Sequence, residues 1–149
     1  SEMCIRDRMI KIYTDGSCLE NPGDGGWAAI IIIDQQKKII SGNQENTTNN
    51  RMELLAPIEA LKTLKKKSKV EIITDSKYVK LGITEWIHNW KMNGWKTSNK
   101  KEVKNIDLWK QLDSLVKDFD TKWSWVKGHS TDLLKNEVDL LAKKAAKLN

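Results

Sequence analysis

The alternation of hydrophobic and polar residues predicts two similar strands, one near the beginning of the chain and one near its middle. Residues 10–13 alternate isoleucine with Lys and Tyr, a period of two that fits a strand with at least one buried face. Asp15 follows, and because Gly16-Ser17 is typical of a turn, we expect this strand to end at Asp15. Residues 70–74 form a second such run, which leads directly into Asp75.

The two aspartates occupy the same position relative to their strands. If the strands are parallel neighbours, Asp15 and Asp75 stand at adjacent carboxyl ends, where open α/β sheets have their sites. Two adjacent carboxylates raise one another's pKa unless a cation lies between them. Either aspartate alone is also explained as the cap of a turn or helix. Their occurrence as a pair on matching strand ends favours a metal site.

The remaining periodicities alternate strands with helices and predict one α/β domain. A hairpin is expected from residues 27–33 and 38–41, followed by a polar loop over residues 43–50. A helix then begins after Thr48 or Asn50, and Glu53 lies three residues after Asn50, as in a capping box. The further expected elements are short helices over 76–81 (ended by Gly82) and 85–92, a loop over 95–105, a helix over 106–119, a strand over 121–126 and a helix over 134–148.

Composition indicates a globular protein with a polyanionic partner. The 149 residues suffice for one domain with a core, and 39% hydrophobic with 31% charged residues is typical of a soluble globule. The net charge of +6 favours a polyanion. No apolar run reaches membrane length and no secretory signal is recognised, so we expect a cytoplasmic location without membrane contact. Residues 1–8 are polar and aperiodic; we interpret them as a disordered or non-native leader and place the domain at residues 9–149.

Four acidic residues stand at structurally distinctive positions. Asp15 and Asp75 end strands, Glu53 lies in the first turns of one helix, and Asp139 lies near the start of the last helix. Glu53 alone is also explained as a capping partner, and Asp139 alone by the helix dipole. Together, the four would form an all-oxygen cage suited to Mg²⁺ or Mn²⁺ rather than zinc. Combined with a basic surface, such a cage indicates metal-dependent phosphodiester chemistry, with two ions about 4 Å apart.

Two further features fit this chemistry. His129 follows a glycine in the loop before Asp139; it is either an ordinary surface residue or a proton carrier. Residues 86–96 interleave tryptophans with basic residues, and the loop that follows carries several lysines. Trp86 and Trp90 share a helical face, which is explained either by burial or by stacking on nucleic acid. Phosphate contacts by the lysines favour nucleic acid.

From residue 9 to its end, the chain resembles a bacterial type 1 ribonuclease H. The resemblance rests on motifs in the family's order: Thr14-Asp15-Gly16-Ser17-Cys18, Asn21-Pro22-Gly23, Thr47-Thr48-Asn49-Asn50-Arg51-Met52-Glu53-Leu54, Thr74-Asp75-Ser76, Trp86-Ile87-His88-Asn89-Trp90, Gly94-Trp95-Lys96-Thr97, Val103-Lys104-Asn105, Asp107-Leu108-Trp109, Val126-Lys127-Gly128-His129 and Asp139. It implies a ribonuclease H-like α/β fold, with a five-stranded mixed sheet and helices on both faces. It also implies an endonuclease that cuts the RNA strand of RNA–DNA hybrids by a two-metal mechanism, leaving 5′-phosphate and 3′-hydroxyl ends.

The resemblance also implies roles for individual residues. Asp15, Glu53, Asp75 and Asp139 match the family's metal-binding carboxylates, with Mg²⁺ as cofactor and Mn²⁺ as its substitute, and His129 matches its catalytic histidine. Asn21, Asn49 and Asn50 match residues that contact the minor groove, and Thr48 and Asn105 match a DNA phosphate pocket. The remaining candidate contacts of a monomer with the hybrid are Cys18, Lys77, Trp86, Trp90, Trp95, Lys96, Lys100, Lys101 and Lys104.

Two other activities remain open at this stage. One is a Mg²⁺ nuclease or strand transferase of the same fold that acts on DNA, and the other is a hybrid-binding module without catalysis. The motif at residues 47–50 argues against the first, and the presence of all four acids argues against the second.

The chain departs from the family at Lys135, where the relatives have a neutral Asn one helical turn before the last aspartate. Lys135 either pairs with Asp139 and competes with the metal, or it extends into solvent, as lysines in a first helical turn commonly do. We expect the solvent-exposed position, and hence a peripheral role for Asp139.

Overall fold

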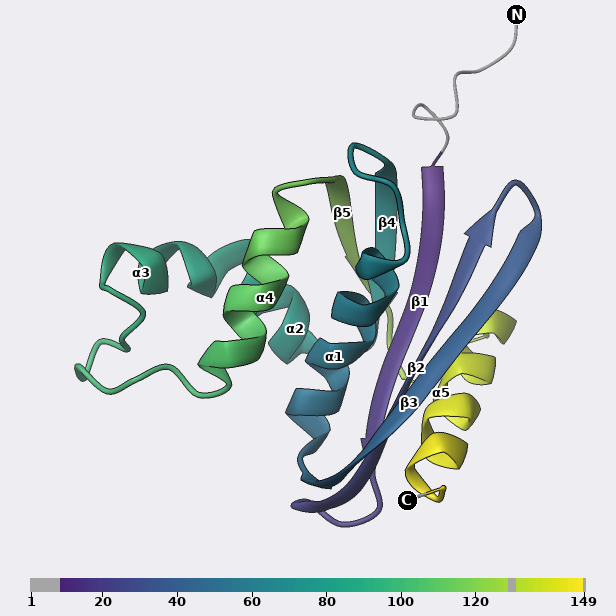
Figure 1. Cartoon of the computed structure of the whole chain (residues 1–149), viewed down its shortest axis with the longest axis horizontal. Coiled ribbons are helices and arrows are strands. Elements are labelled where there is room, and N and C mark those ends of the chain that lie inside the picture. The colour runs from purple at the N-terminus through teal and green to yellow at the C-terminus, as the bar shows by residue number, and fades with distance from the viewer. Residues whose placement is uncertain (1–8, 129–130, 149) are drawn as a thin grey trace, which may run out of the picture.

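The computed structural model describes residues 9–128 and 131–148, so the predicted leader at residues 1–8 lies outside the described residues. The described chain forms one sheet with strand order β3-β2-β1-β4-β5 and helices on both faces (Figure 1). β1 pairs antiparallel with β2 and parallel with β4, which confirms the predicted mixed sheet. The strands are β1 (Met9–Cys18), β2 (Gly23–Ile33), β3 (Gln36–Thr47), β4 (Lys69–Thr74) and β5 (Asp120–Trp125).

β1 continues past Asp15, where the sequence predicted its end. Its parallel pairing with β4 stops at Tyr13, but its antiparallel pairing with β2 continues to Cys18. Gly16 therefore lies within the strand and not in a turn. A Cβ atom at this position would overlap the backbone of helix α1 (Asn49–Lys62), so glycine is required because the helix passes so close.

β2 and β3 form the predicted hairpin, but β3 is longer than predicted. Asp34 and Gln35 connect the strands with φ values of 51° and 69°, and two positive values in succession are typical of a type I′ turn. β3 extends to Thr47, so the prediction of a polar loop over residues 43–50 was wrong. Residues 43–46 are all exposed, because β3 is an edge strand; they therefore show no alternation.

Helix α1 begins after Thr48, one of its two predicted caps. The Thr48 hydroxyl accepts a hydrogen bond from the backbone N–H of Arg51 at 3.2 Å. The capping box predicted for Asn50 and Glu53 was wrong, since the Glu53 carboxylate accepts a hydrogen bond from the backbone N–H of Gly16. This contact joins the start of α1 to β1 and directs Glu53 toward the end of the sheet where Asp15 lies.

The helices cover the sheet from both sides. α1 packs on β1 and β2 and also against α4, whereas α5 packs on the opposite face of β1 and β2 (Figure 1). Ile12, Leu54 and Trp109 belong to the core beneath α1 and α4, and Tyr13 and Val138 belong to the core beneath α5. The remaining helical elements are α2 (Lys77–Leu81), the π-helical turn η2 (Gly82–Trp86), α3 (Ile87–Met92), α4 (Ile106–Val116) and α5 (Leu133–Ala146). None of the helices in the described ranges has both the length and the apolar character needed to span a membrane.

Gly82 does not end a helix, contrary to the sequence-based expectation. The chain passes from α2 through η2 into α3 without leaving helical geometry, and Gly82 has an ordinary helical φ of −60°. A Cβ atom on Gly82 would overlap the ring of Trp109 in α4. Glycine at this position therefore allows the two helical segments to pack closely.

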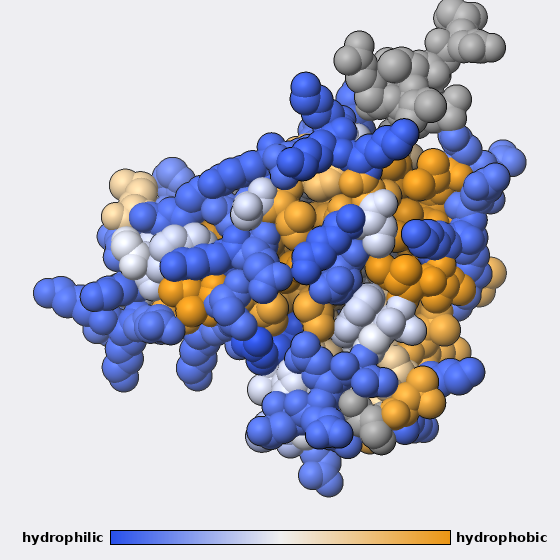
Figure 2. All heavy atoms as spheres, in the orientation of Figure 1, coloured by the Kyte–Doolittle hydropathy of each residue, from blue (hydrophilic) through white to orange (hydrophobic). Residues whose placement is uncertain are grey.

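The segment 87–105, called the arm below, extends away from the sheet (Figure 1). Figure 2, in the same orientation, shows a mostly hydrophilic surface on this extension. Four of the five lysines proposed to contact nucleic acid are exposed on it: Lys96, Lys100, Lys101 and Lys104.

Candidate active site

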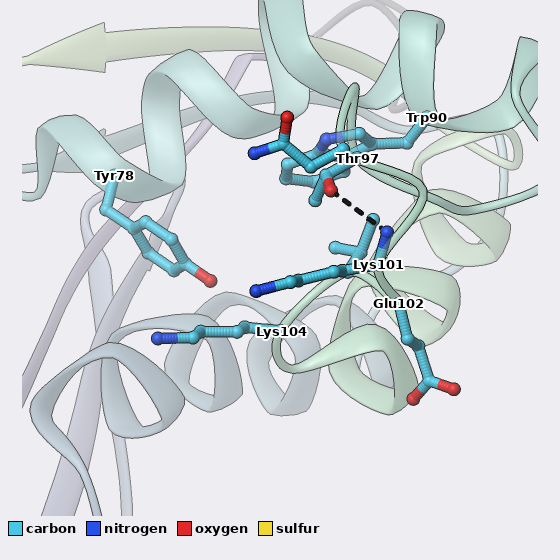
Figure 3. A pocket seen from close by; sticks show the side chains of 8 residues that line it. Tyr78, Trp90, Thr97, Lys101, Glu102 and Lys104 are labelled. Carbon is cyan, nitrogen blue, oxygen red and sulfur yellow. Dashed lines mark hydrogen bonds between the residues drawn. The ribbon is translucent and has the colours of Figure 1, made fainter.

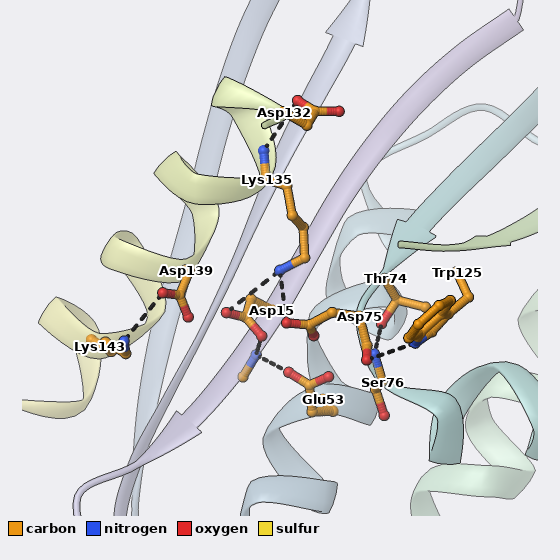
Figure 4. Close-up of polar contacts among 11 residues, drawn as sticks. Asp15, Glu53, Thr74, Asp75, Ser76, Trp125, Asp132, Lys135, Asp139 and Lys143 are labelled. Atoms are coloured by element: carbon orange, nitrogen blue, oxygen red, sulfur yellow. Dashed lines mark hydrogen bonds and ion pairs between the residues drawn. The ribbon is translucent and has the colours of Figure 1, made fainter. Parts of the chain in front are cut away.

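Three of the four predicted acids meet just beyond the point where the parallel pairing of β1 with β4 ends. Asp15 comes from β1, Asp75 directly follows β4, and Glu53 reaches them from α1 (Figure 4). One carboxylate oxygen of each residue lies within 4.8 Å of those of the other two. Asp15 and Glu53 are buried, with exposures of 4% and 8%. The predicted adjacency of the two strand-end aspartates is therefore confirmed.

Hydrogen bonds to neighbouring elements fix the residues around Asp75. The indole N–H of Trp125, the last residue of β5, donates to the backbone carbonyl of Asp75 at 2.9 Å. The backbone N–H of Ser76 donates to the Thr74 hydroxyl at 3.0 Å, and Ser76 in turn caps α2. These contacts turn the chain directly after β4 and present the Asp75 side chain to Asp15.

Burial changes the acidity of the cluster. Desolvation raises the pKa of Asp15 to about 6, with further contributions from side-chain hydrogen bonds to Glu53, which lowers it, and to Asp139, which raises it. Desolvation and the neighbouring Asp15 hold the pKa of Glu53 well above its usual value. Carboxylates that are costly to ionise next to one another are stabilised by a cation between them. The donor set contains oxygen alone and fits Mg²⁺ or Mn²⁺ rather than zinc.

Lys135 also lies in this cluster, so the expectation that it extends into solvent was wrong. The side chain comes from the first turn of α5 and the residue is only 1% exposed. Its Nζ atom lies 3.2 Å from Oδ2 of Asp75 and 3.7 Å from Oδ2 of Asp15 (Figure 4). Sequence spacing showed that Lys135 and Asp139 share a helical face, but it did not show that this face packs against the carboxyl end of β1.

Asp139 lies at the edge of the cluster. It is not among the three acids whose oxygens lie within 4.8 Å of one another. Its carboxylate is electrostatically coupled to that of Asp15 and forms an ion pair with Lys143 at 3.1 Å. Although desolvation opposes ionisation, the hydrogen bonds from Asp15 and Lys143 hold the pKa of Asp139 below its usual value. Asp15 therefore belongs to the three-acid cluster and also lies next to Asp139.

His129 lies outside the described residues. Gly128, the last described residue before it, passes beside the cluster, because a Cβ atom built on Gly128 would lie 3.3 Å from Oδ2 of Asp75. The loop that leads to His129 therefore begins next to a candidate metal ligand.

The polar residues assigned to the minor groove form a second group. The backbone N–H of Cys18 donates to Oδ1 of Asn49 at 2.7 Å, and the backbone N–H of Asn49 donates to Oδ1 of Asn21 at 3.3 Å. These bonds connect the end of β1, the following loop and the start of α1. Asn21, Asn49 and Asn50 are exposed, so their remaining polar atoms face solvent.

Thr48 and Asn105 are connected through Arg51, whose role the sequence analysis did not identify. The Arg51 guanidinium donates to Oδ1 of Asn105 at 3.3 Å and to both carboxylate oxygens of Asp107, at 3.0 and 2.8 Å. Asn105 has a positive φ of 59° and its side-chain amide donates to the hydroxyl of Tyr78 at 3.0 Å. Arg51 is visible in the sequence only as part of a motif, since neither periodicity nor spacing marks it.

Trp86 and Trp90 fit both explanations that their spacing allowed. Trp86 packs on Tyr78 and on Trp90, with 6.0 Å between ring centroids in each pair, and Trp90 packs on Trp109 at 5.3 Å. The two tryptophans thus anchor the arm to the core. Trp86 nevertheless remains 36% exposed, which leaves part of its ring accessible.

The remaining candidate contacts lie on the arm and beside Asp75. Tyr78, Trp90, Lys101 and Lys104 line a pocket at the base of the arm, and both lysine side chains point toward Tyr78 (Figure 3). Trp95 is half-buried, with the Lys110 ammonium 5.6 Å from its ring centroid. Lys77 is exposed and its ammonium lies 4.8 Å from the centroid of the Trp125 ring.

Comparisons with known proteins agree with this geometry. The family model described as RNase H matches residues 7–147. A ribonuclease H of Pseudoalteromonas atlantica is 57% identical over 137 residues, which are 92% of this chain and 90% of the relative. A ribonuclease H of Wolbachia pipientis wMel is 59% identical over 134 residues, 90% of this chain and 92% of the relative. Among solved structures, LC9-RNase H1, described as a type 1 RNase H with the type 2 active-site motif, superimposes with a TM-score of 0.86 at 28% identity and covers 99% of this chain and 75% of its own.

Proposed function

The chain belongs to the ribonuclease H family of enzymes, and on this premise we propose that it cuts the RNA strand of RNA–DNA hybrids internally, using two Mg²⁺ ions. The products are a 5′-phosphate and a 3′-hydroxyl, and Mn²⁺ substitutes for Mg²⁺. The observation that carries the proposal is the convergence of three carboxylates, from Asp15, Glu53 and Asp75, at one point on the sheet.

The carboxylates divide into two overlapping sets of ligands. Asp15, Glu53 and Asp75 would hold one cation, and Asp15 and Asp139 would contribute to holding the other, since Asp15 is adjacent both to the three-acid cluster and to Asp139. Two divalent cations bound there would supply an activated water and stabilise the leaving oxygen. Asp139 is the more exposed ligand and already pairs with Lys143, so its contribution is smaller than that of Asp15.

The exposed polar residues beside this cluster select the hybrid. Asn21, Asn49 and Asn50, together with the backbone at Cys18, form hydrogen bonds to 2′-hydroxyl groups and base edges of the minor groove. The 2′-hydroxyl is the group that distinguishes RNA from DNA, so these contacts place the RNA strand over the carboxylates. His129 acts as a proton carrier that assists turnover.

A separate set of residues binds the DNA strand of the hybrid. Thr48 and Asn105 bind one phosphate of the DNA strand. Arg51 contacts both residues, because its backbone N–H donates to the Thr48 hydroxyl and its guanidinium donates to Asn105. Trp86 packs on that strand through its exposed part, and Lys77, Trp90 and Trp95 contribute at its margins. The lysines of the arm neutralise neighbouring phosphates.

The test is cleavage of labelled substrates by the wild-type protein and by two aspartate variants. We expect cleavage of the RNA strand of a hybrid in Mg²⁺, none in EDTA, and none of an RNA duplex or a DNA duplex. Asp15→Asn and Asp75→Asn should abolish cleavage and leave hybrid binding nearly unchanged, because each removes a charged metal ligand but no contact with the hybrid. Retention of more than a few per cent of activity by both variants refutes the assignment.

A matched control separates loss of a ligand from loss of any carboxylate. Asp120 is exposed at the start of β5, the end of that strand remote from Asp75. Asp120→Asn should therefore cleave the hybrid at the wild-type rate. Cleavage of the DNA duplex by the wild-type protein would instead favour a DNA nuclease.

A further inference from the structure

Within the described residues, Lys135 is the basic side chain that lies inside the carboxylate cluster. It comes from α5, on the face of the sheet opposite α1, and its burial is nearly complete, at 1% exposure. Its ammonium lies 3.2 Å from Asp75 and 3.7 Å from Asp15. A lysine is almost never fully buried unless it is paired, and both partners of this one are candidate metal ligands.

The ammonium and a divalent cation require the same oxygen atoms. Lys135 contacts Oδ2 of Asp75 and Oδ2 of Asp15, two of the three carboxylates that define the cluster. The ammonium neutralises one negative charge on these groups, whereas Mg²⁺ neutralises two. A divalent cation that binds Asp15 and Asp75 therefore reduces the attraction that holds Lys135 and repels its ammonium.

We propose that Lys135 is an internal cation that competes with the divalent metal for Asp15 and Asp75. It thereby weakens metal binding and stabilises the metal-free form. This inference rests on the proposed function only in that the cluster binds a metal. In effect, the chain supplies its own counterion to a group of buried acids and exchanges it for the metal ion.

The last helix provides a second position for the displaced ammonium. Asp139 lies one helical turn after Lys135, and side chains four residues apart lie on the same helical face. The four-carbon side chain of Lys135 can rotate from Asp75 to Asp139 without movement of the α5 backbone. When one cation has bound Asp15, Glu53 and Asp75 and no second cation has reached Asp139, Lys135 thus pairs with Asp139, whose carboxylate is partly exposed and shared with Lys143.

The experiment measures metal binding directly, without substrate. Mg²⁺ is titrated into the metal-free wild-type protein and into Lys135→Met by isothermal titration calorimetry, and the melting temperature of each is recorded with and without Mg²⁺. Met has a length close to that of Lys but carries no charge. We expect Lys135→Met to bind Mg²⁺ at least tenfold more tightly, to melt at a lower temperature without metal, and to gain more from Mg²⁺ than the wild type does.

A control and a second variant make the outcome decisive. Lys144→Met removes an exposed ammonium from the same helix, and none of the described ion pairs joins Lys144 to Asp15, Asp75 or Asp139; its Mg²⁺ affinity should change less than twofold. If Lys135→Met does not fold without metal, Lys135→Gln, which keeps a polar end, is measured in its place. Unchanged or weaker Mg²⁺ affinity of the Lys135 variant refutes the competition and leaves the proposed function intact. Absence of Mg²⁺ binding in every variant and in the wild type refutes both.

Discussion

Substitution of Tyr78 by phenylalanine should destabilise the protein through a single oxygen atom. The Tyr78 hydroxyl accepts hydrogen bonds from the indole N–H of Trp109 and from the amide of Asn105, each at 3.0 Å. Trp109 is fully buried, with an exposure of 0%, so its N–H has no access to water once the acceptor is removed. Phenylalanine retains the ring contact with Trp109, at 5.3 Å between centroids, so that packing changes little.

The size of the expected destabilisation follows from the unequal burial of the two donors, Trp109 and Asn105. A buried donor left without a partner costs about 1–3 kcal/mol, whereas Asn105 is half-exposed and can turn to water. We therefore expect Tyr78→Phe to lower the free energy of unfolding by about 2 kcal/mol. For a domain of this size that corresponds to a decrease in melting temperature of about 4–8 °C.

Urea denaturation of wild type, Tyr78→Phe, Trp109→Phe and the double variant tests this reasoning. The midpoint should fall in Tyr78→Phe while the slope m stays constant. Because the oxygen and the indole N–H act as a pair, the two single effects should not add, with a coupling of about 1 kcal/mol. A loss below about 0.5 kcal/mol in Tyr78→Phe, or strict additivity, would show that the hydrogen bond does not matter to stability. Asn105 also loses one of its two side-chain bonds, so KM for a hybrid should rise while kcat stays unchanged.

Three other outcomes are expected. Neutralising the exposed arm lysines Lys96, Lys100, Lys101 and Lys104 should raise KM. It should also reduce the slope of log binding constant against log salt concentration by about one unit for each lost phosphate contact, whereas an unchanged slope would mean that these lysines contact only solvent. In steady-state assays His129→Ala should slow turnover strongly but less than Asp15→Asn does, because a proton carrier does not hold the metals; equal losses would contradict this division. In EDTA, the free energy of unfolding should fall as the pH rises from about 4 to above 6, because burial raises the pKa of Asp15 from 3.8 to about 6 and the folded state therefore binds the proton more tightly than the unfolded state. Chemical denaturation across this range should show a smaller change with pH for Asp15→Asn than for the wild type. An identical pH dependence of the two proteins would contradict the raised pKa of Asp15.

The sequence predicted those features that depend on one element at a time. Periods of two and of three to four identify β1, β4 and α4, and the adjacency of Asp15 and Asp75 follows from β1 and β4 being parallel neighbours. The polar part of β3 was missed because an edge strand with both faces in water has no alternation. The burial of Lys135 depends on how α5 sits on the sheet, and no local pattern encodes that.

The same limit applies to small residues and to aromatic ones. Gly82 was interpreted as a helix end because glycine commonly is one, but its role is set by the Trp109 ring on a different helix. The spacing of Trp86 and Trp90 placed them on one face and left their neighbours undefined. Only the contacts with Tyr78 and Trp109 show that they anchor the arm.

β1 has one further consequence, because its two edges end at different places. Past Tyr13 it remains paired with β2 but no longer with β4, so the sheet divides into two branches and Asp15 lies where they separate. Glu53 arrives there from the layer on one face and Asp139 from the layer on the other. A cation bound by these residues would therefore connect two hydrophobic cores that lie on opposite faces of the sheet. Binding of the cation then requires that both helical layers are packed on the sheet, and not merely that one loop is in place.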